Sequence, residues 1–187
     1  EGFWNDMNEP AIFYTPEHLS AVFEKLHEYE NMELDINTFF AMKCSVLQLD
    51  QNPEDFQMFY HQMPEGRIRH DRVHNLYGYY LTRAAQEAFL KLRPGKRTML
   101  FSRASCIGMH RYSGIWTGDN ASQWVQLLMN IKMMPSLNMC GFLYSGADIG
   151  GFGDDTTEDL LLRWLEFGIF MPLMRNHTTT GTRRQEL

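Results

Sequence analysis

The sequence has few cysteines and no pattern that would pair them. Cys44, Cys106 and Cys140 are odd in number and far apart, and no C-x-x-C spacing occurs. A disulfide scaffold is therefore excluded. We expect three reduced thiols that act as small buried hydrophobic side chains in a cytosolic protein.

An excess of basic residues and a long apolar run are also absent. The chain has 17 Lys and Arg against 23 Asp and Glu, and its formal net charge of −6 argues against nucleic acid as a partner. No apolar run approaches the roughly 18 residues of a membrane span. No secretory signal pattern opens the chain, so no membrane partner is expected.

The residues that are present suffice for a folded core. Hydrophobic residues make up 44% and aromatic residues 13% of the 187 positions, which fits one globular domain or part of a larger one. The chain opens without Met on a motif-rich stretch and closes on a polar stretch that completes no element. We therefore expect a fragment of a longer protein.

Helix-like and strand-like segments alternate along the chain. Apolar spacing and capping residues predict helices that begin near Thr15, Asp71, Asn120 and Thr156. Trp124 and Trp164 lie on apolar faces of the last two helices and are expected in the core. Short apolar runs predict strands just before Asp6, at 98–102, 113–117 and 141–145, and near 176.

The stretch from about 30 to 70 fits neither pattern. It mixes a short apolar run with the turn signal Asn52-Pro53-Glu54. We interpret it as an insertion in the main scaffold.

An ionisable residue follows each predicted strand. Strands that alternate with helices favour βα units around a parallel sheet, and ionisable residues at the carboxyl ends of such strands are typical of a (β/α)8-barrel active site. We therefore predict the α/β class and a partial (β/α)8 barrel. The residues in question are Asp6, Arg103, Asp119, Asp148 and His177.

Two of these carboxylates stand close to tryptophans. Asp6 follows Trp4, and Asp119 follows Trp116. Indole faces offer an apolar platform for the C–H surface of a sugar ring, and a pair of carboxylates is what glycoside hydrolysis requires. The alternative is that Asp6 caps a turn and Asp119 caps a helix.

A family resemblance adds to this interpretation. The run WNDMNEP (residues 4–10) resembles the nucleophile motif of glycoside hydrolase family 31, the α-glucosidases. Within that family, the sequence most resembles compact bacterial enzymes of gut Firmicutes, including ones that accept isomaltose. Further stretches resemble the family in the same order: HNLYG (74–78), SR (102–103), HRY (110–112), WTGD (116–119), GADIGGF (146–152) and MRNH (174–177).

The resemblance implies a fold and a role for each matching residue. The fold is a (β/α)8 barrel, of which residues 1–187 would be the C-terminal part, from about strand four to just after strand eight. Asp6 would be the nucleophile and Asp119 the general acid/base, while Glu9 would be structural. The substrate-binding residues would be Trp4, Met7, Arg103, Trp116, Asp148, Phe152 and His177.

The implied activity is a retaining, exo-acting α-glucosidase that removes terminal α-glucosyl residues from short oligosaccharides in the bacterial cytoplasm. The alternatives are an α-xylosidase or a sulfoquinovosidase of the same family, or a non-catalytic sugar-binding barrel fragment. Linkage and oligomeric state are left open. No cofactor is expected, because the reaction needs two carboxylates and water. No metal is expected either, since His70 and His74 lack a third ligand nearby.

Overall fold

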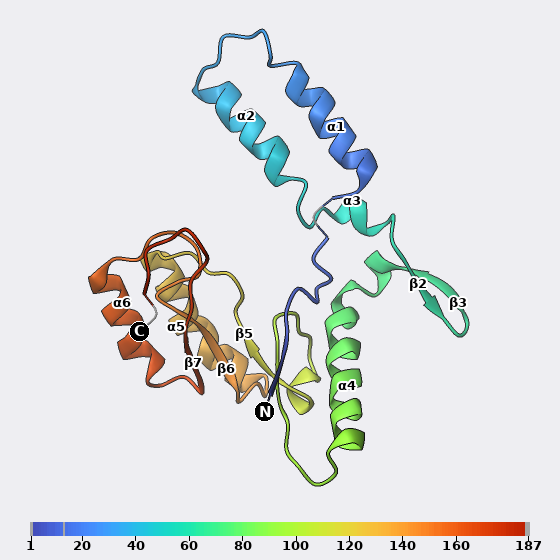
Figure 1. The fold of residues 1–187 in the computed structure, drawn as a ribbon, viewed down its shortest axis with the longest axis vertical. Helices are drawn as coiled ribbons and strands as arrows, with labels where there is room; N and C mark the ends of the chain where they lie inside the picture. The colour runs from blue at the N-terminus through green and yellow to red at the C-terminus, as the bar shows by residue number, and fades with distance from the viewer. Residues whose placement is uncertain (1, 13, 186–187) are drawn as a thin grey trace. The chain divides into compact units, whose positions relative to one another are not determined.

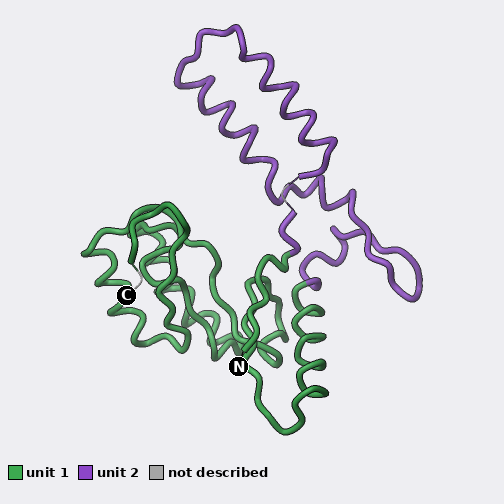
Figure 2. The backbone as a smooth tube through the Cα atoms, viewed as in Figure 1, with its two compact units in different colours: residues 1–9, 78–187 green, residues 10–77 purple. Residues whose placement is uncertain are grey.

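A computed structural model describes residues 2–12 and 14–185 of the chain. They fall into two compact units (Figure 2). Unit 1 comprises residues 1–9 and 78–187, and unit 2 comprises residues 10–77. Each unit is described by itself.

Unit 1 is built on one parallel sheet (Figure 1). Its five strands are hydrogen-bonded in the order β1-β4-β5-β6-β7, and every neighbouring pair is parallel. The intervening helices include α5 (Trp124–Met139) and α6 (Glu158–Gly168), so the predicted α/β class and partial (β/α)8 barrel are confirmed. The strands are β1 (Gly2–Asn5), β4 (Met99–Ser102), β5 (Gly114–Trp116), β6 (Ser145–Ile149) and β7 (Leu173–Asn176).

The strand predicted at 141–145 is wrong, because β6 begins only at Ser145. Residues before it end helix α5 (Trp124–Met139) instead: the Gly141 N–H donates to Asn138 O, and the Phe142 N–H donates to Leu137 O. Gly141 has a φ of 93°, the left-handed conformation that closes a helix in this way. Asp148 consequently lies within β6 and not after it.

Helices α5 and α6 (Glu158–Gly168) pack on β6 to form the main core. Thr157 caps α6 by accepting a hydrogen bond from the Leu160 N–H, one residue after the predicted cap. None of the described helices is long and apolar enough to cross a membrane. The buried members of this core are Leu127, Met134, Ala147, Ile149, Leu160, Trp164 and Met171.

Two expectations about burial are wrong. Trp164 is fully buried as predicted, but the Trp124 side chain is 52% exposed because it stands in the first turn of α5. Cys44 and Cys140 are exposed and Cys106 is half-buried, so none of the three thiols fills a core. Cys140 is the C-cap of α5, where the chain leaves the packed helix.

Unit 2 contains a helical hairpin and a β-hairpin (Figure 1). Thr15 caps the first helix as predicted, by accepting a hydrogen bond from the His18 N–H. The Thr15 hydroxyl also donates to Asp55 at 2.7 Å, which ties α1 to α3. The elements are α1 (Pro16–His27), α2 (Ile36–Leu47), α3 (Pro53–Phe56), β2 (Tyr60–Met63), β3 (Gly66–Arg69) and the short 3-10 helix η1 (His70–Arg72).

Three histidines of unit 2 form a hydrogen-bonded chain. His61 Nε2 lies 2.8 Å from His70 Nδ1, and His70 Nε2 lies 2.9 Å from His74 Nδ1. His70 is fully buried, and His74 stacks on Phe56. The long helix α4 (His74–Leu92) begins at this chain, three residues later than predicted, because η1 precedes it.

Candidate active site

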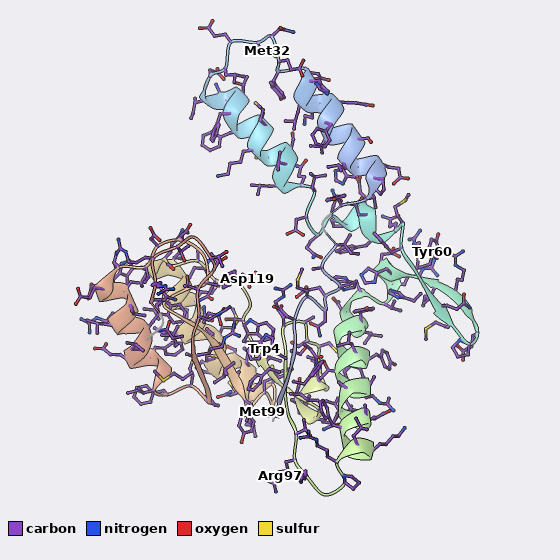
Figure 3. The ribbon with its side chains drawn as sticks, viewed as in Figure 1. Trp4, Met32, Tyr60, Arg97, Met99 and Asp119 are labelled. Atoms are coloured by element: carbon purple, nitrogen blue, oxygen red, sulfur yellow. The ribbon has the colours of Figure 1, made fainter. Side chains whose placement is uncertain are left out.

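The carboxyl ends of the parallel strands bring ionisable side chains to one edge of the sheet. Asp6 follows β1, Arg103 follows β4, and Asp119 stands three residues beyond β5. Figure 3 labels Asp119, in the loop after β5, and Trp4, on β1. Parallel pairing explains why residues so far apart in the sequence meet here.

Arg103 joins three carboxylates with one guanidinium. Its Nε donates to Glu9 Oε1 at 2.6 Å, and its Nη2 donates to Glu9 Oε2 at 3.0 Å. The remaining nitrogen, Nη1, lies 3.0 Å from Asp6 Oδ1 and 3.6 Å from Asp119 Oδ2. The hydrogen bond with Glu9 is the main cause that raises the pKa of Arg103 above its ordinary value.

Asp6 and Asp119 are therefore close neighbours. Because one nitrogen contacts an oxygen of each, the separation of those two oxygens cannot exceed the sum of the two contact distances. Both side chains are about half exposed, at 49% and 53%. A molecule arriving from solvent can thus reach both.

The loop after β1 is fixed by hydrogen bonds to the end of β4 and to the loop that follows it. The Asn8 side chain donates to Ser102 Oγ at 2.8 Å and accepts from the Ala104 N–H at 3.0 Å. Met7 takes a φ of 54°, rare for a residue other than glycine, and its N–H donates to Asp6 Oδ1 at 2.7 Å. Met7 thus holds Asp6 through its backbone, while its side chain is exposed.

An aromatic cluster involves β1 and β5, the strands that precede the two carboxylates. The ring centres of Trp4 and Trp116 are 4.1 Å apart, and Trp4 also stacks on Phe101 at 5.4 Å. A second ring pair joins Phe152 and His177 at 5.3 Å.

Asp148 is the buried carboxylate of the site, with 1% of its surface exposed. Its Oδ1 accepts from Arg175 Nε at 3.0 Å and from Arg175 Nη2 at 2.6 Å. Its Oδ2 is buried and has no hydrogen-bond donor in the part of the chain that the structure describes. Burial raises the pKa of Asp148, and Arg175 opposes that shift.

Of the nine residues singled out in the sequence, eight fall into three groups and Asp148 stands apart. Asp6, Asp119 and Arg103 form one charged cluster, and Met7 joins it through its backbone. The other groups are Trp4 with Trp116, and Phe152 with His177. Asp148 does not contact Arg103; it binds Arg175, which links it to the Trp4 ring.

The sequence does not reveal the partners of two residues. The resemblance implies only that Glu9 is structural, and in the structure both of its carboxylate oxygens bind Arg103. Arg175 stands in a family motif without a predicted role, and in the structure it binds Asp148 and contacts Trp4. The one sequence signal for Glu9 is its place three residues after Asp6 in the same motif. Within the described residues, no cluster of three or more His, Cys, Asp or Glu side chains is placed to hold a metal ion.

Comparisons with known proteins agree on one family. The model of the glycosyl hydrolases family 31 TIM-barrel domain matches residues 1–187. Alpha-glucosidase 2 of Bacillus thermoamyloliquefaciens is 34% identical over 186 residues, which are 100% of this chain and 19% of that protein. Neutral alpha-glucosidase C of Homo sapiens is 31% identical over 184 residues, which are 98% of this chain and 16% of that protein.

A solved structure supports the same likeness. The GH31 dextranase of Flavobacterium johnsoniae, complexed with glucose, superposes with a TM-score of 0.68 at 28% identity. The match covers 98% of this chain and 19% of the dextranase chain. The chain thus spans less than a fifth of the length of each of these relatives.

The expectation of a bacterial cytoplasmic protein is wrong. Proteins of human, mouse and rice match the chain at 31–35% identity, alongside the bacterial one at 34%. Sequences similar to this chain are therefore not restricted to bacteria. The three free cysteines of this segment do not indicate the cellular compartment of the protein.

Proposed function

This chain belongs to glycosyl hydrolase family 31, and we propose that it supplies the nucleophile and the acid/base of a retaining α-glucosidase. The observation that carries the proposal is the single Arg103 nitrogen shared by Asp6 and Asp119. Two carboxyl groups that share one guanidinium nitrogen can stand about 5–5.5 Å apart, the separation that retaining enzymes use.

In the first step Asp6 attacks the anomeric carbon of a terminal α-glucosyl residue. The bond from that carbon to the glycosidic oxygen breaks, and the protonated Asp119 gives its proton to the leaving oxygen. A β-glucosyl ester forms on Asp6.

In the second step Asp119, now a carboxylate, takes a proton from water. The water oxygen attacks the anomeric carbon, the ester bond to Asp6 breaks, and α-glucose leaves. The enzyme returns to its starting protonation state, and two inversions give net retention.

Arg103 suits both steps because the negative charge changes place between them. Asp6 is charged before the first step, and Asp119 is charged in the ester intermediate. Arg103 Nη1 stands 3.0 Å from one carboxylate and 3.6 Å from the other, so a fixed cation is beside whichever is ionised. Glu9 holds the guanidinium in that position by accepting hydrogen bonds from the Nε and Nη2 atoms of Arg103.

The remaining residues fit a subsite for one sugar ring. Trp4 and Trp116 provide an apolar wall, Met7 follows Trp4 by three residues, and Phe152 lies against His177. The half-buried His177 ring is suited to bind a sugar hydroxyl, whereas the buried Asp148 would act on the subsite through Arg175. Short α-glucosyl oligosaccharides are the proposed substrates, in keeping with the names of the relatives.

The domain organisation follows from the same proposal. We assign residues 1–187 to the C-terminal part of the catalytic barrel domain. Within it, residues 10–77 form the insertion, and its bounds are those of unit 2.

The test replaces each carboxylate in turn and follows hydrolysis of an aryl α-glucoside. Asp6→Ala should abolish turnover, and Asp119→Ala should lower it by roughly a hundredfold or more. Azide should restore Asp119→Ala by forming an α-glucosyl azide, since it attacks a β-glucosyl ester. Asp159→Asn, on the exposed face of α6, is the control and should keep full activity.

Activity of Asp6→Ala within tenfold of the unaltered chain would refute the assignment of the nucleophile. A β-glucosyl azide from Asp119→Ala would refute the retaining mechanism.

A further inference from the structure

One contact joins the two outermost strands of the sheet. Trp4 lies on β1, the first strand in the sheet order, and Arg175 lies on β7, the last strand. Nevertheless, the Arg175 guanidinium carbon is 4.2 Å from the centre of the Trp4 ring. The sheet therefore curls enough for side chains of its two edges to touch across its inner face.

Asp148 fixes the guanidinium on the β7 side. Asp148 and Arg175 are directly paired in the β6–β7 register, and two Arg175 nitrogens bind the same carboxylate oxygen at 3.0 and 2.6 Å. The Asp148 side chain is 1% exposed, so solvent does not compete for this ion pair. A planar guanidinium held through two nitrogens has a defined orientation for stacking on a ring.

On the β1 side, Trp4 contacts both Arg175 and Trp116. Its ring lies 4.1 Å from the Trp116 ring of β5, and Arg175 is itself 5.8 Å from Trp116. A cation over an indole face is attracted by the ring electrons, most strongly where water is excluded. Side chains of β6, β7, β1 and β5 thus follow one another in the order Asp148, Arg175, Trp4, Trp116.

We propose that Arg175 is a positioning residue: clamped by Asp148, it holds the Trp4 indole against Trp116 and thereby sets where Asp6, two residues after Trp4, stands relative to Asp119. The inference rests on the proposed function, because the residue that it positions is the proposed nucleophile. Arg175 itself touches neither Asp6 nor Asp119 in the ion pairs described above.

The first test uses a spectroscopic signal of the indole pair. Two indoles 4.1 Å apart give an exciton-coupled band in circular dichroism. Trp4→Phe and Trp116→Phe identify that band by removing it. Arg175→Met should remove most of its amplitude, and so should Arg175→Lys, whose ammonium keeps the charge beside Asp148 but cannot stack as a plane.

The matched control is Arg163→Met on α6, where the arginine pairs with Glu166 on an exposed surface and should leave the band unchanged. If Arg175→Met does not unfold cooperatively, Arg175→Lys decides alone. A full-amplitude band in a cooperatively folded Arg175→Lys or Arg175→Met variant would overturn the proposal. That result would mean that Arg175 only neutralises Asp148.

The second test measures hydrolysis. Arg175→Lys should lower kcat by roughly tenfold or more with a smaller change in KM, because a displaced nucleophile slows the chemical step. An unchanged kcat with a lost exciton band would overturn the positioning of Asp6. If the unaltered chain hydrolyses no α-glucoside, the proposed function fails, whereas the exciton band still reports whether Arg175 orders Trp4.

Discussion

At the scale of single residues, Arg103 shows how one side chain organises the site. Two nitrogens of its guanidinium bind Glu9, and the third contacts both Asp6 and Asp119. A lysine has a single nitrogen with one point charge and could not bind the three carboxylates in this arrangement. The planar fork therefore places one cation beside both proposed catalytic carboxylates while Glu9 holds its other side.

His70 is the other residue whose surroundings determine its chemistry. It is fully buried, and it bonds His61 with one ring nitrogen and His74 with the other. Burial, followed by the neighbouring His74 and His61, lowers its pKa from 6.5 to about 4, while Asp71 opposes the shift. The rings of Phe56 and Tyr77 pack against it and bring no charge.

This shift predicts a pH dependence of stability. Between pH 6.5 and about 4 the unfolded chain binds a proton at His70 and the folded chain does not. Folding free energy is therefore fully present above pH 6.5 and is lost as the pH falls toward 4, by on the order of 3 kcal/mol. Urea unfolding at pH 7 and pH 4.5 measures the loss.

His70→Gln should reduce that loss, and His27→Gln, an exposed histidine of α1, should not. An equal loss in His70→Gln and the unaltered chain would contradict the assignment to His70.

At the scale of elements, the pairing of β6 with β7 depends on a glycine. A Cβ on Gly146 would lie 2.1 Å from the Leu173 backbone oxygen and 2.7 Å from the Leu173 Cβ. Backbone cannot move aside as a flexible side chain can. Gly146 thus allows β7 to approach closely enough for Asp148 to pair with Arg175.

Gly146→Ala is expected to destabilise the fold by about 3 kcal/mol, because the added methyl group separates the two strands. Gly153→Ala is the matched control, since a Cβ there meets nothing within 4 Å and its φ is not positive. It should change stability by less than about 0.5 kcal/mol. Equal destabilisation by the two variants, measured by urea unfolding, would show that the close approach at Gly146 is not what matters.

Most strands could be predicted, because a short apolar run followed by an ionisable residue is a local pattern. This worked for β4, β5 and β7 and for the positions of Asp6, Arg103 and Asp119. It failed for β6, because Gly141 to Tyr144 also form an apolar run but serve to close helix α5. It also failed for Trp124, whose helical spacing is that of a buried residue although it stands in the first turn.

At the scale of the whole molecule, the contacts that shape the site join residues remote in sequence. Glu9 and Arg103 are 94 positions apart, and Trp4 meets Arg175 from the opposite edge of the sheet. Alternating strands and helices predict a curled parallel sheet, but not which side chains touch across it. Such pairs depend on curvature and register, which a single sequence does not specify.

The sequence pattern does not show which unit a helix joins. The insertion predicted near 30–70 stays a prediction; unit 2 runs from 10 to 77 and so also includes helix α1, which the sequence predicts well. An amphipathic pattern shows that a helix forms and not which unit it packs in.

Asp6, as the proposed nucleophile, should form a covalent glucosyl ester. A fluorinated α-glucosyl fluoride can trap this ester, because the fluorine on the sugar slows its breakdown and lets it accumulate. Intact mass and peptide mapping should then show one added fluoroglucosyl group on Asp6, and none on the Asp6→Ala variant. A folded chain that carries no label, or carries it on Asp119 or Glu9, would contradict the account.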